Sequence, residues 1–113
     1  MTLPPRIAKK PKRETRWRSP AHLAFVRSHH CCVPNCAGMP IEAAHVRAGS
    51  DGGMGLKPSD FFAISLCRDH HAEQHSVGEV TFASRYGLDL HRLADGFAQV
   101  SPKAADIRKA RNG

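Results

Sequence analysis

The chain has 113 residues, a length that suits one domain with a modest core. Only 6% of the residues are aromatic and the mean hydropathy is −0.43, so such a core would benefit from a crosslink. The sequence has no run of about 18 apolar residues, which excludes a membrane-spanning helix, and its basic start lacks the apolar segment of a secretory signal peptide.

Four cysteines and eight histidines are the most informative part of the composition. Without a signal peptide the chain is expected in the cytoplasm, where thiols stay reduced and disulfides are rare. Metal binding is therefore the expected role of the cysteines, and buried thiols without a ligand are the alternative.

Residues 1–18 are predicted to form a flexible basic arm, because they combine three prolines with much of the excess positive charge. The formal net charge of +7 and the pI near 9.8 suit a nucleic-acid partner, although a solubilising tail has a similar composition. Trp17 would stack on a base or anchor the arm to the domain. The candidate nucleic-acid contacts in the arm are Lys9, Lys10, Lys12, Arg13, Arg16 and Arg18.

The first helix is predicted to begin after Ser19, which can act as N-cap before Pro20 at the first helical position. The pattern continues the helix to His30. Residues 31–36, CCVPNC, are too short and too interrupted by proline for a regular element. They predict a tight turn, or knuckle.

Two strands are expected next, at residues 41–46 (IEAAHV) and 61–67 (FFAISLC). Four glycines and a proline within 48–60 predict a long loop between them. Asp69 is the predicted N-cap of a following helix, HHAEQHSV, and Gly87 is the predicted end of another over 78–87. Weaker helical patterns cover 89–100 and 101–113.

The cysteines and histidines form two short-spaced pairs, which is the usual arrangement of a structural zinc site. The first pair is Cys36 with either Cys31 or Cys32, since adjacent residues rarely bind one ion. The second pair is Cys67 with His70. Two such pairs would crosslink the segments on either side of the predicted hairpin.

His71 and His75 form a further pair, because residues four apart share one face of a helix. His70 is turned by about 100° from His71 and so points elsewhere. If His70 belongs to the zinc site, His71 and His75 are free to bind a divalent ion with open positions for water and substrate. The alternatives are that both face solvent, or that one of them replaces His70 at the zinc.

The order of these motifs resembles the HNH, or ββα-metal, nucleases. The resemblance covers about residues 29–78 and rests on the knuckle, IEAAHVR, SDGGMGLK and LCRDHHAEQH. It implies an α+β fold whose small core, a two-stranded hairpin plus a helix, is stapled by structural zinc and flanked by further helices. Residues 19–113 would form a single HNH-like domain, with 79–113 as a helical extension.

The resemblance also implies roles for individual residues. His45 matches the general base, and His71 and His75 match the ligands of a catalytic divalent metal, Mg²⁺ or another ion. The structural Zn²⁺ would be held by Cys31, Cys36, Cys67 and His70, with Cys32 as the alternative to Cys31.

The sequence departs from the family pattern at two places. Ala44 stands where the family usually has a metal-binding Asp or His, and Glu42 or a water would have to compensate. The central Asn of the family has no clear counterpart, and Asp60 is the nearest polar residue.

These inferences predict a divalent-metal-dependent endonuclease that hydrolyses phosphodiester bonds in DNA, with RNA left open, in a bacterial or phage-infected cell. Arg47 and Arg68 are candidates to clamp the scissile phosphate. One alternative is a non-catalytic zinc-stapled nucleic-acid-binding module, which would hold one metal per chain and bind phosphate independently of His45. A third class is a phage assembly or interaction protein that uses the fold as a scaffold and binds nucleic acid weakly. No membrane partner is expected, and the oligomeric state is left open.

Overall fold

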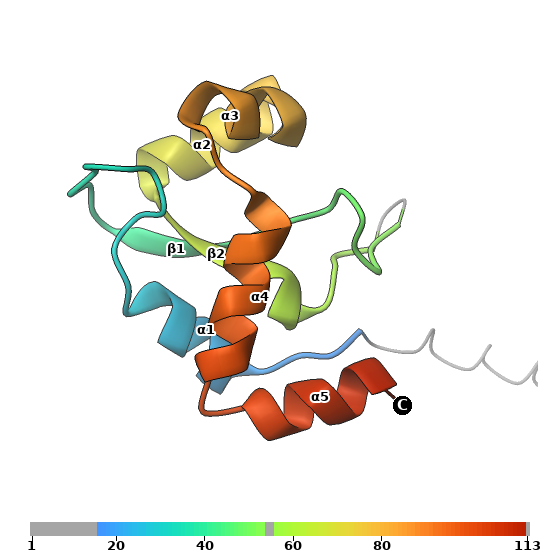
Figure 1. Ribbon diagram of the computed structural model, residues 1–113. Helices are drawn as coiled ribbons and strands as arrows, with labels where there is room; N and C mark the ends of the chain where they lie inside the picture. Colours follow the sequence, from blue (N-terminus) through green and yellow to red (C-terminus); the bar gives the residue numbers. More distant parts are fainter. Residues whose placement is uncertain (1–15, 54–55, 113) are drawn as a thin grey trace, which may run out of the picture.

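The chain adopts an α+β fold in which helices surround a two-stranded antiparallel sheet (Figure 1). The computed structural model describes residues 16–53 and 56–112. Lys9, Lys10, Lys12 and Arg13 of the predicted arm lie outside the described residues. Each helix within the described ranges is too short or too polar to cross a membrane.

Helix α1, Pro20–Arg27, begins as predicted: the Ser19 hydroxyl accepts a hydrogen bond from the backbone N–H of His22 at 3.1 Å. The helix ends before the predicted His30. Ser28 caps it and donates its hydroxyl proton to the Phe25 carbonyl at 2.6 Å. Serine side chains that bond nearby carbonyls compete with continued helix, which explains the early end.

The predicted strands pair as a hairpin. Strand β1, Ile41–His45, lies antiparallel to β2, Ala63–Cys67, in the register Ile41↔Cys67 to His45↔Ala63. All five residues of β2 are buried. Strand β2 begins two residues later than predicted, because Asp60–Phe62 forms the short 3₁₀ helix η1.

Helix α2, Arg68–Val77, follows β2 without an intervening loop. Its N-cap is Cys67, whose sulfur accepts from the backbone N–H of His70 at 3.5 Å. The prediction of Asp69 as N-cap is therefore wrong: the helix begins before Asp69, which lies within its first turn. Strand β1, strand β2 and helix α2 thus form one β–β–α unit, with the loop and η1 between the two strands.

The predicted C-terminal helices are confirmed. Helix α3, Glu79–Tyr86, ends at Gly87, which has a φ of 65° in the left-handed region that favours glycine. Helix α4, Leu90–Val100, is capped by Asp89, and α5, Ala104–Asn112, follows it. Helices α2 and α3 lie above the hairpin in Figure 1, and α1 and α5 lie below it.

The main core lies between the hairpin and the helices α3 and α4, and Phe82 is fully buried there. A smaller cluster joins Phe61, Ala98 and Ile107, with Trp17 packed against its edge. Because α1, α2 and α4 all contact the sheet, the short hairpin is the element that fixes their relative positions.

The boundary of the predicted flexible arm at residue 18 is too late, since Trp17 and Arg18 are held against the domain. The backbone N–H of Trp17 donates to the Ser59 hydroxyl at 3.1 Å, and the backbone carbonyl of Trp17 accepts from the backbone N–H of Asp60 at 2.9 Å. The Arg18 guanidinium donates to the Lys57 carbonyl at 2.8 Å and also to the Pro58 carbonyl. Trp17 therefore anchors the N-terminal segment.

Stability is expected to fall below pH 6.5 because of His22, which is 0% exposed and bonds Ser101 through Nδ1 at 2.8 Å. Burial lowers the pKa of His22 from its usual value of 6.5, so the unfolded chain takes up the proton first as the pH falls. The free energy of unfolding should therefore decline as the pH falls below about 6.5, the pKa of histidine in the unfolded chain. Urea titrations of the wild type and His22→Gln measure this: the pH slope should be smaller in the variant, and equal slopes would contradict the assignment.

Candidate functional site

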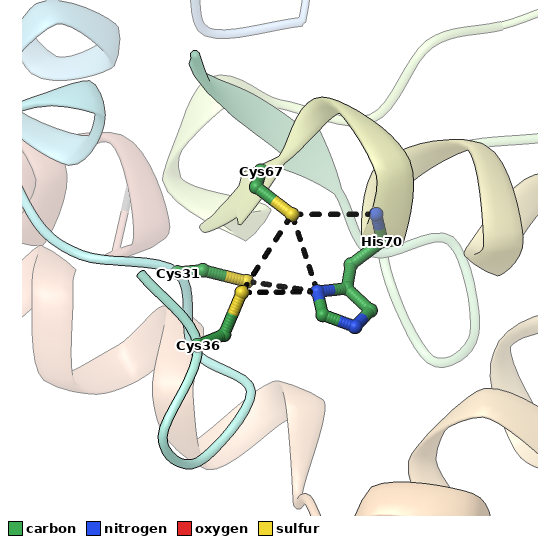
Figure 2. Close-up of side chains that lie close together, drawn as sticks. All are labelled: Cys31, Cys36, Cys67 and His70. Atoms are coloured by element: carbon green, nitrogen blue, oxygen red, sulfur yellow. Dashed lines mark hydrogen bonds between the residues drawn. The ribbon is translucent and has the colours of Figure 1, made fainter. Parts of the chain in front are cut away.

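Four side chains converge at the junction of β2 and α2. The ligand atoms of Cys31, Cys36, Cys67 and His70 all lie within 4.8 Å of one another (Figure 2). The His70 Nδ1 atom is 3.4 Å from the sulfurs of Cys31 and Cys36 and 3.2 Å from that of Cys67. The sulfurs of Cys36 and Cys67 are 3.8 Å apart. This cluster could hold a metal ion.

The spacing of the cluster fits tetrahedral coordination. Zinc lies about 2.3 Å from thiolate sulfur and about 2.0–2.1 Å from imidazole nitrogen, so tetrahedral ligands have S···S separations of about 3.8 Å and S···N separations of about 3.6 Å. The S···S distance of 3.8 Å matches, and the S···N distances of 3.2 to 3.4 Å agree to a few tenths of an ångström. Three thiols and one imidazole are also the donor set that zinc prefers.

The geometry separates the two adjacent cysteines of the knuckle. The sulfur of Cys32 faces the Ser65 hydroxyl at 3.4 Å, and its N–H donates to the Ser65 carbonyl at 2.8 Å. Cys32 therefore ties the knuckle to β2, and Cys31 is the residue that joins the cluster. Asn35 makes the tight turn with a φ of 61°, a conformation that Asn tolerates better than most residues.

The surroundings shift the pKa values of two thiols of the cluster in opposite directions. Burial raises the pKa of Cys31 to about 11, whereas a hydrogen bond from the Gly38 N–H lowers the pKa of Cys36. A Cβ atom at Gly38 would lie only 2.9 Å from the Cys67 sulfur, so glycine is required for the chain to pass this close. A bound cation would favour the thiolate form of Cys31 despite its burial.

A second group of polar side chains surrounds a cavity of about 660 Å³. The cavity collects imidazoles, cations and one carboxylate from α1, β1, α2 and the loop between the strands. Its lining residues are Leu23, Arg27, Glu42, Ala43, His45, Arg47, Lys57, Pro58, His71 and His75. The predicted base and the predicted catalytic-metal ligands therefore share one cavity.

His45 is oriented by Asp60. The Nε2 atom of His45 lies 2.9 Å from Asp60 Oδ1, and Asp60 is 2% exposed. Burial alone would raise the pKa of Asp60, but the hydrogen bonds from His45 and the Ser19 N–H, with the charge of Arg18, hold it below its ordinary value.

The ionised state of Asp60 decides the tautomer of His45. An ionised carboxylate only accepts hydrogen bonds, so Nε2 must carry the proton in this pair. The neutral ring then has its lone pair on Nδ1, where it can accept a proton. The sequence offered Asp60 only as the polar residue nearest to the missing Asn of the HNH pattern, and the fold brings it to His45.

Glu42 orients His71 in the same way. Its Oε1 atom is 2.8 Å from His71 Nδ1, which leaves the lone pair of His71 on Nε2. The Nε2 atoms of His71 and His75 lie 3.2 Å apart. This distance fits an N–H···N hydrogen bond between the rings, and it also fits the separation of about 3.0 to 3.4 Å between two imidazole nitrogens bound to one ion.

Of the predicted arginine contacts with nucleic acid that lie within the described residues, only Arg47 lies in the cavity. Arg47 lines the cavity, and its backbone N–H is held by the Glu79 carboxylate at 2.7 Å. Arg68 is exposed at the start of α2 and is not among the cavity residues, so its predicted role at the scissile phosphate is not supported. Arg16 is half-buried, and Arg18 is paired with Asp60.

Sequence reasoning missed Arg27 and Lys57 as cavity residues. Arg27 ends α1 and Lys57 lies in the loop before η1, so both are outside the histidine and cysteine motifs. Lys57 is the last residue of the SDGGMGLK motif and Arg27 lies in no motif, but neither was predicted as a cavity residue, because only the packing of α1 and of the loop between the strands brings them to the cavity.

The comparisons with known proteins identify a family. A family model described as a protein of unknown function, DUF968, matches residues 3–100. The chain is also 39% identical over 91 residues to a protein of Escherichia coli K12 named "Uncharacterized protein YdfU". That alignment covers 80% of this chain, and the chain spans only 25% of the length of YdfU. No solved structure matches significantly.

The two knuckle cysteines offer a matched test of the cluster. Cys31→Ser should greatly reduce zinc retention during dialysis against a chelator, because it removes one of four ligands, whereas Cys32→Ser should keep about one zinc per chain. Elemental analysis by mass spectrometry gives the zinc content of both variants. Equal zinc loss from the two variants would contradict the assignment of Cys31.

Proposed function

We propose that this chain, which belongs to the DUF968 family of proteins of unknown function, is a divalent-metal-dependent endonuclease that hydrolyses phosphodiester bonds in DNA. One observation carries the proposal: a single cavity holds a histidine oriented by a carboxylate and a histidine pair with the spacing of a metal chelate. General base and Lewis acid are the two components that phosphodiester hydrolysis needs.

The structural part of the proposal is a zinc ion at Cys31, Cys36, Cys67 and His70. This ion would join the knuckle before β1 to the junction between β2 and α2. It would fix the end of the hairpin against the helix that carries His71 and His75. We therefore assign β1, β2 and α2 as a zinc-stapled ββα-metal core.

In the proposed mechanism, Nδ1 of His45 takes a proton from the water that attacks phosphorus. The ring becomes positively charged in this step, and the buried Asp60 carboxylate stabilises that charge through Nε2. His71 and His75 would hold a divalent ion such as Mg²⁺, which supplies electrostatic stabilisation of the phosphate and the leaving oxygen. Arg47 adds positive charge to the same cavity.

The site differs from the HNH pattern at the two positions where the sequence departs from it. Ala44 is 0% exposed and has no ligand atom, so it contributes nothing to the catalytic ion. Glu42 instead bonds Nδ1 of His71, and this bond orients the ring so that Nε2 is available to the metal. Asp60 would hold the base in place of the family's Asn and would add a negative charge that Asn lacks.

The activity is tested by plasmid nicking with added Mg²⁺ or Mn²⁺. We expect cleavage by the wild type and a loss of about 10²- to 10⁴-fold in His45→Ala, because the general base is removed. His30→Ala is the matched control, since His30 is exposed and does not line the cavity. Absence of nicking with several divalent ions, by folded protein that retains zinc, would favour the non-catalytic nucleic-acid-binding alternative.

Glu42 should set the affinity for the catalytic ion. Glu42→Ala is expected to raise the Mn²⁺ concentration for half-maximal cleavage by about 10- to 100-fold, because the orienting bond to His71 is lost. Glu42→Gln keeps an acceptor for His71 and should have a smaller effect. Metal titrations of cleavage rate make the measurement, and unchanged midpoints in both variants would rule out this role.

A further inference from the structure

The cavity carries more positive charge than catalysis alone requires. Three of its lining residues are cations, Arg27, Arg47 and Lys57, whereas the one carboxylate, Glu42, is engaged by His71. A bound divalent ion would add further positive charge. The cavity therefore suits a ligand with several negative charges rather than a single phosphate group.

Arg27 and Lys57 approach this cavity from two separate elements. Arg27 extends from the last turn of α1, whose neighbouring residue Val26 is 0% exposed and fixes the helix against the core. Lys57 lies in the loop between the strands, beside the buried Pro58. Neither cation forms part of the base, its carboxylate partner or the histidine chelate.

The backbone at Lys57 is held in place from the N-terminal segment. The Arg18 guanidinium donates to the carbonyls of Lys57 and Pro58 and pairs with Asp60 at 3.2 Å. Arg18 thus connects the position of Lys57 to the carboxylate that orients His45. A cation on a fixed backbone loses less conformational freedom on binding than one on a mobile loop.

We propose that Arg27 and Lys57 are substrate-binding residues that hold backbone phosphates next to the scissile one. This inference rests on the proposed function, because it identifies the scissile phosphate by its position near His45 and the histidine chelate. The ligand is a continuous phosphodiester backbone, for which each contact releases counterions and adds to the salt dependence of binding. Their contribution is to affinity and register rather than to the chemical step.

The test is DNA binding by a protein that does not cleave. Fluorescence anisotropy with a labelled duplex, at several salt concentrations and without added divalent ion, gives the Kd and its salt slope in a His45→Ala background. Arg27→Gln and Lys57→Gln should each weaken binding several-fold and reduce the salt slope by about one. Arg27→Lys should retain most of the affinity, because it keeps the charge.

Arg108→Gln is the matched control, since Arg108 is exposed on α5 and does not line the cavity. It should leave the Kd and the slope near those of the parent. Both target side chains are exposed, so their substitution leaves the core intact, and zinc content confirms the folded state. Parent-like Kd and slope in both Arg27→Gln and Lys57→Gln would overturn the inference.

The outcome is separable from that of the proposed function. If binding is weakened in these variants but the wild type never nicks DNA, the phosphate contacts are supported and the proposed nuclease activity is contradicted. If the wild type nicks DNA but binding is unchanged in the variants, the nuclease activity is supported and the phosphate contacts of Arg27 and Lys57 are contradicted.

Discussion

The arrangement of the candidate site depends on the convergence of three thiols and one imidazole at the junction of β2 and α2. The hairpin has only five residues in each strand, and an isolated two-stranded hairpin is at best marginally stable in water. The proposed zinc would join the knuckle, the strand end and the first turn of the helix through side-chain bonds. In small domains, the free energy of binding such an ion contributes directly to folding.

Adjacent histidines at the start of α2 can serve two sites because of helix geometry. Each residue is turned by about 100° from its neighbour, so His70 and His71 point in different directions. His70 faces the thiols, and His71 faces the cavity together with His75, one turn later. Because one rigid helix carries ligands for both sites, the proposed structural zinc would fix the position of the proposed catalytic ion.

Two histidines of the cavity, His45 and His71, each bond a carboxylate through the ring nitrogen that would not bind the proton or the metal. Asp60 bonds the far nitrogen of His45, and Glu42 bonds the far nitrogen of His71. In each pair an acceptor-only carboxylate fixes the tautomer, so that the remaining lone pair is the one available for a proton or a metal. Asp60 keeps its charge despite burial because Arg18 and the Ser19 N–H also bind it.

Much of the fold could be predicted because its signals are local. The start of α1 follows from Ser19 and Pro20, the end of α3 follows from Gly87, and the strands follow from short apolar runs. The cap of α2 could not be predicted in this way, because the Cys67 thiol takes the place that Asp69 would ordinarily fill.

The candidate site shows the same division between local and long-range signals. Ligand spacing predicted the grouping of Cys36, Cys67 and His70, because short-spaced pairs are a local property. The contacts of Asp60 with His45, and of Arg27 and Lys57 with the cavity, depend on long-range packing that spacing does not encode.

The central claim is that His70 and His71 bind two different ions, and anomalous X-ray diffraction tests it most directly. Crystals of the zinc-loaded protein soaked in Mn²⁺ would be measured at the absorption edges of both metals. The account predicts a zinc peak among Cys31, Cys36, Cys67 and His70 and a separate manganese peak between His71 and His75. A zinc ion bound by His71 instead of His70, or manganese bound elsewhere with His71 and His75 left without an ion, would contradict it.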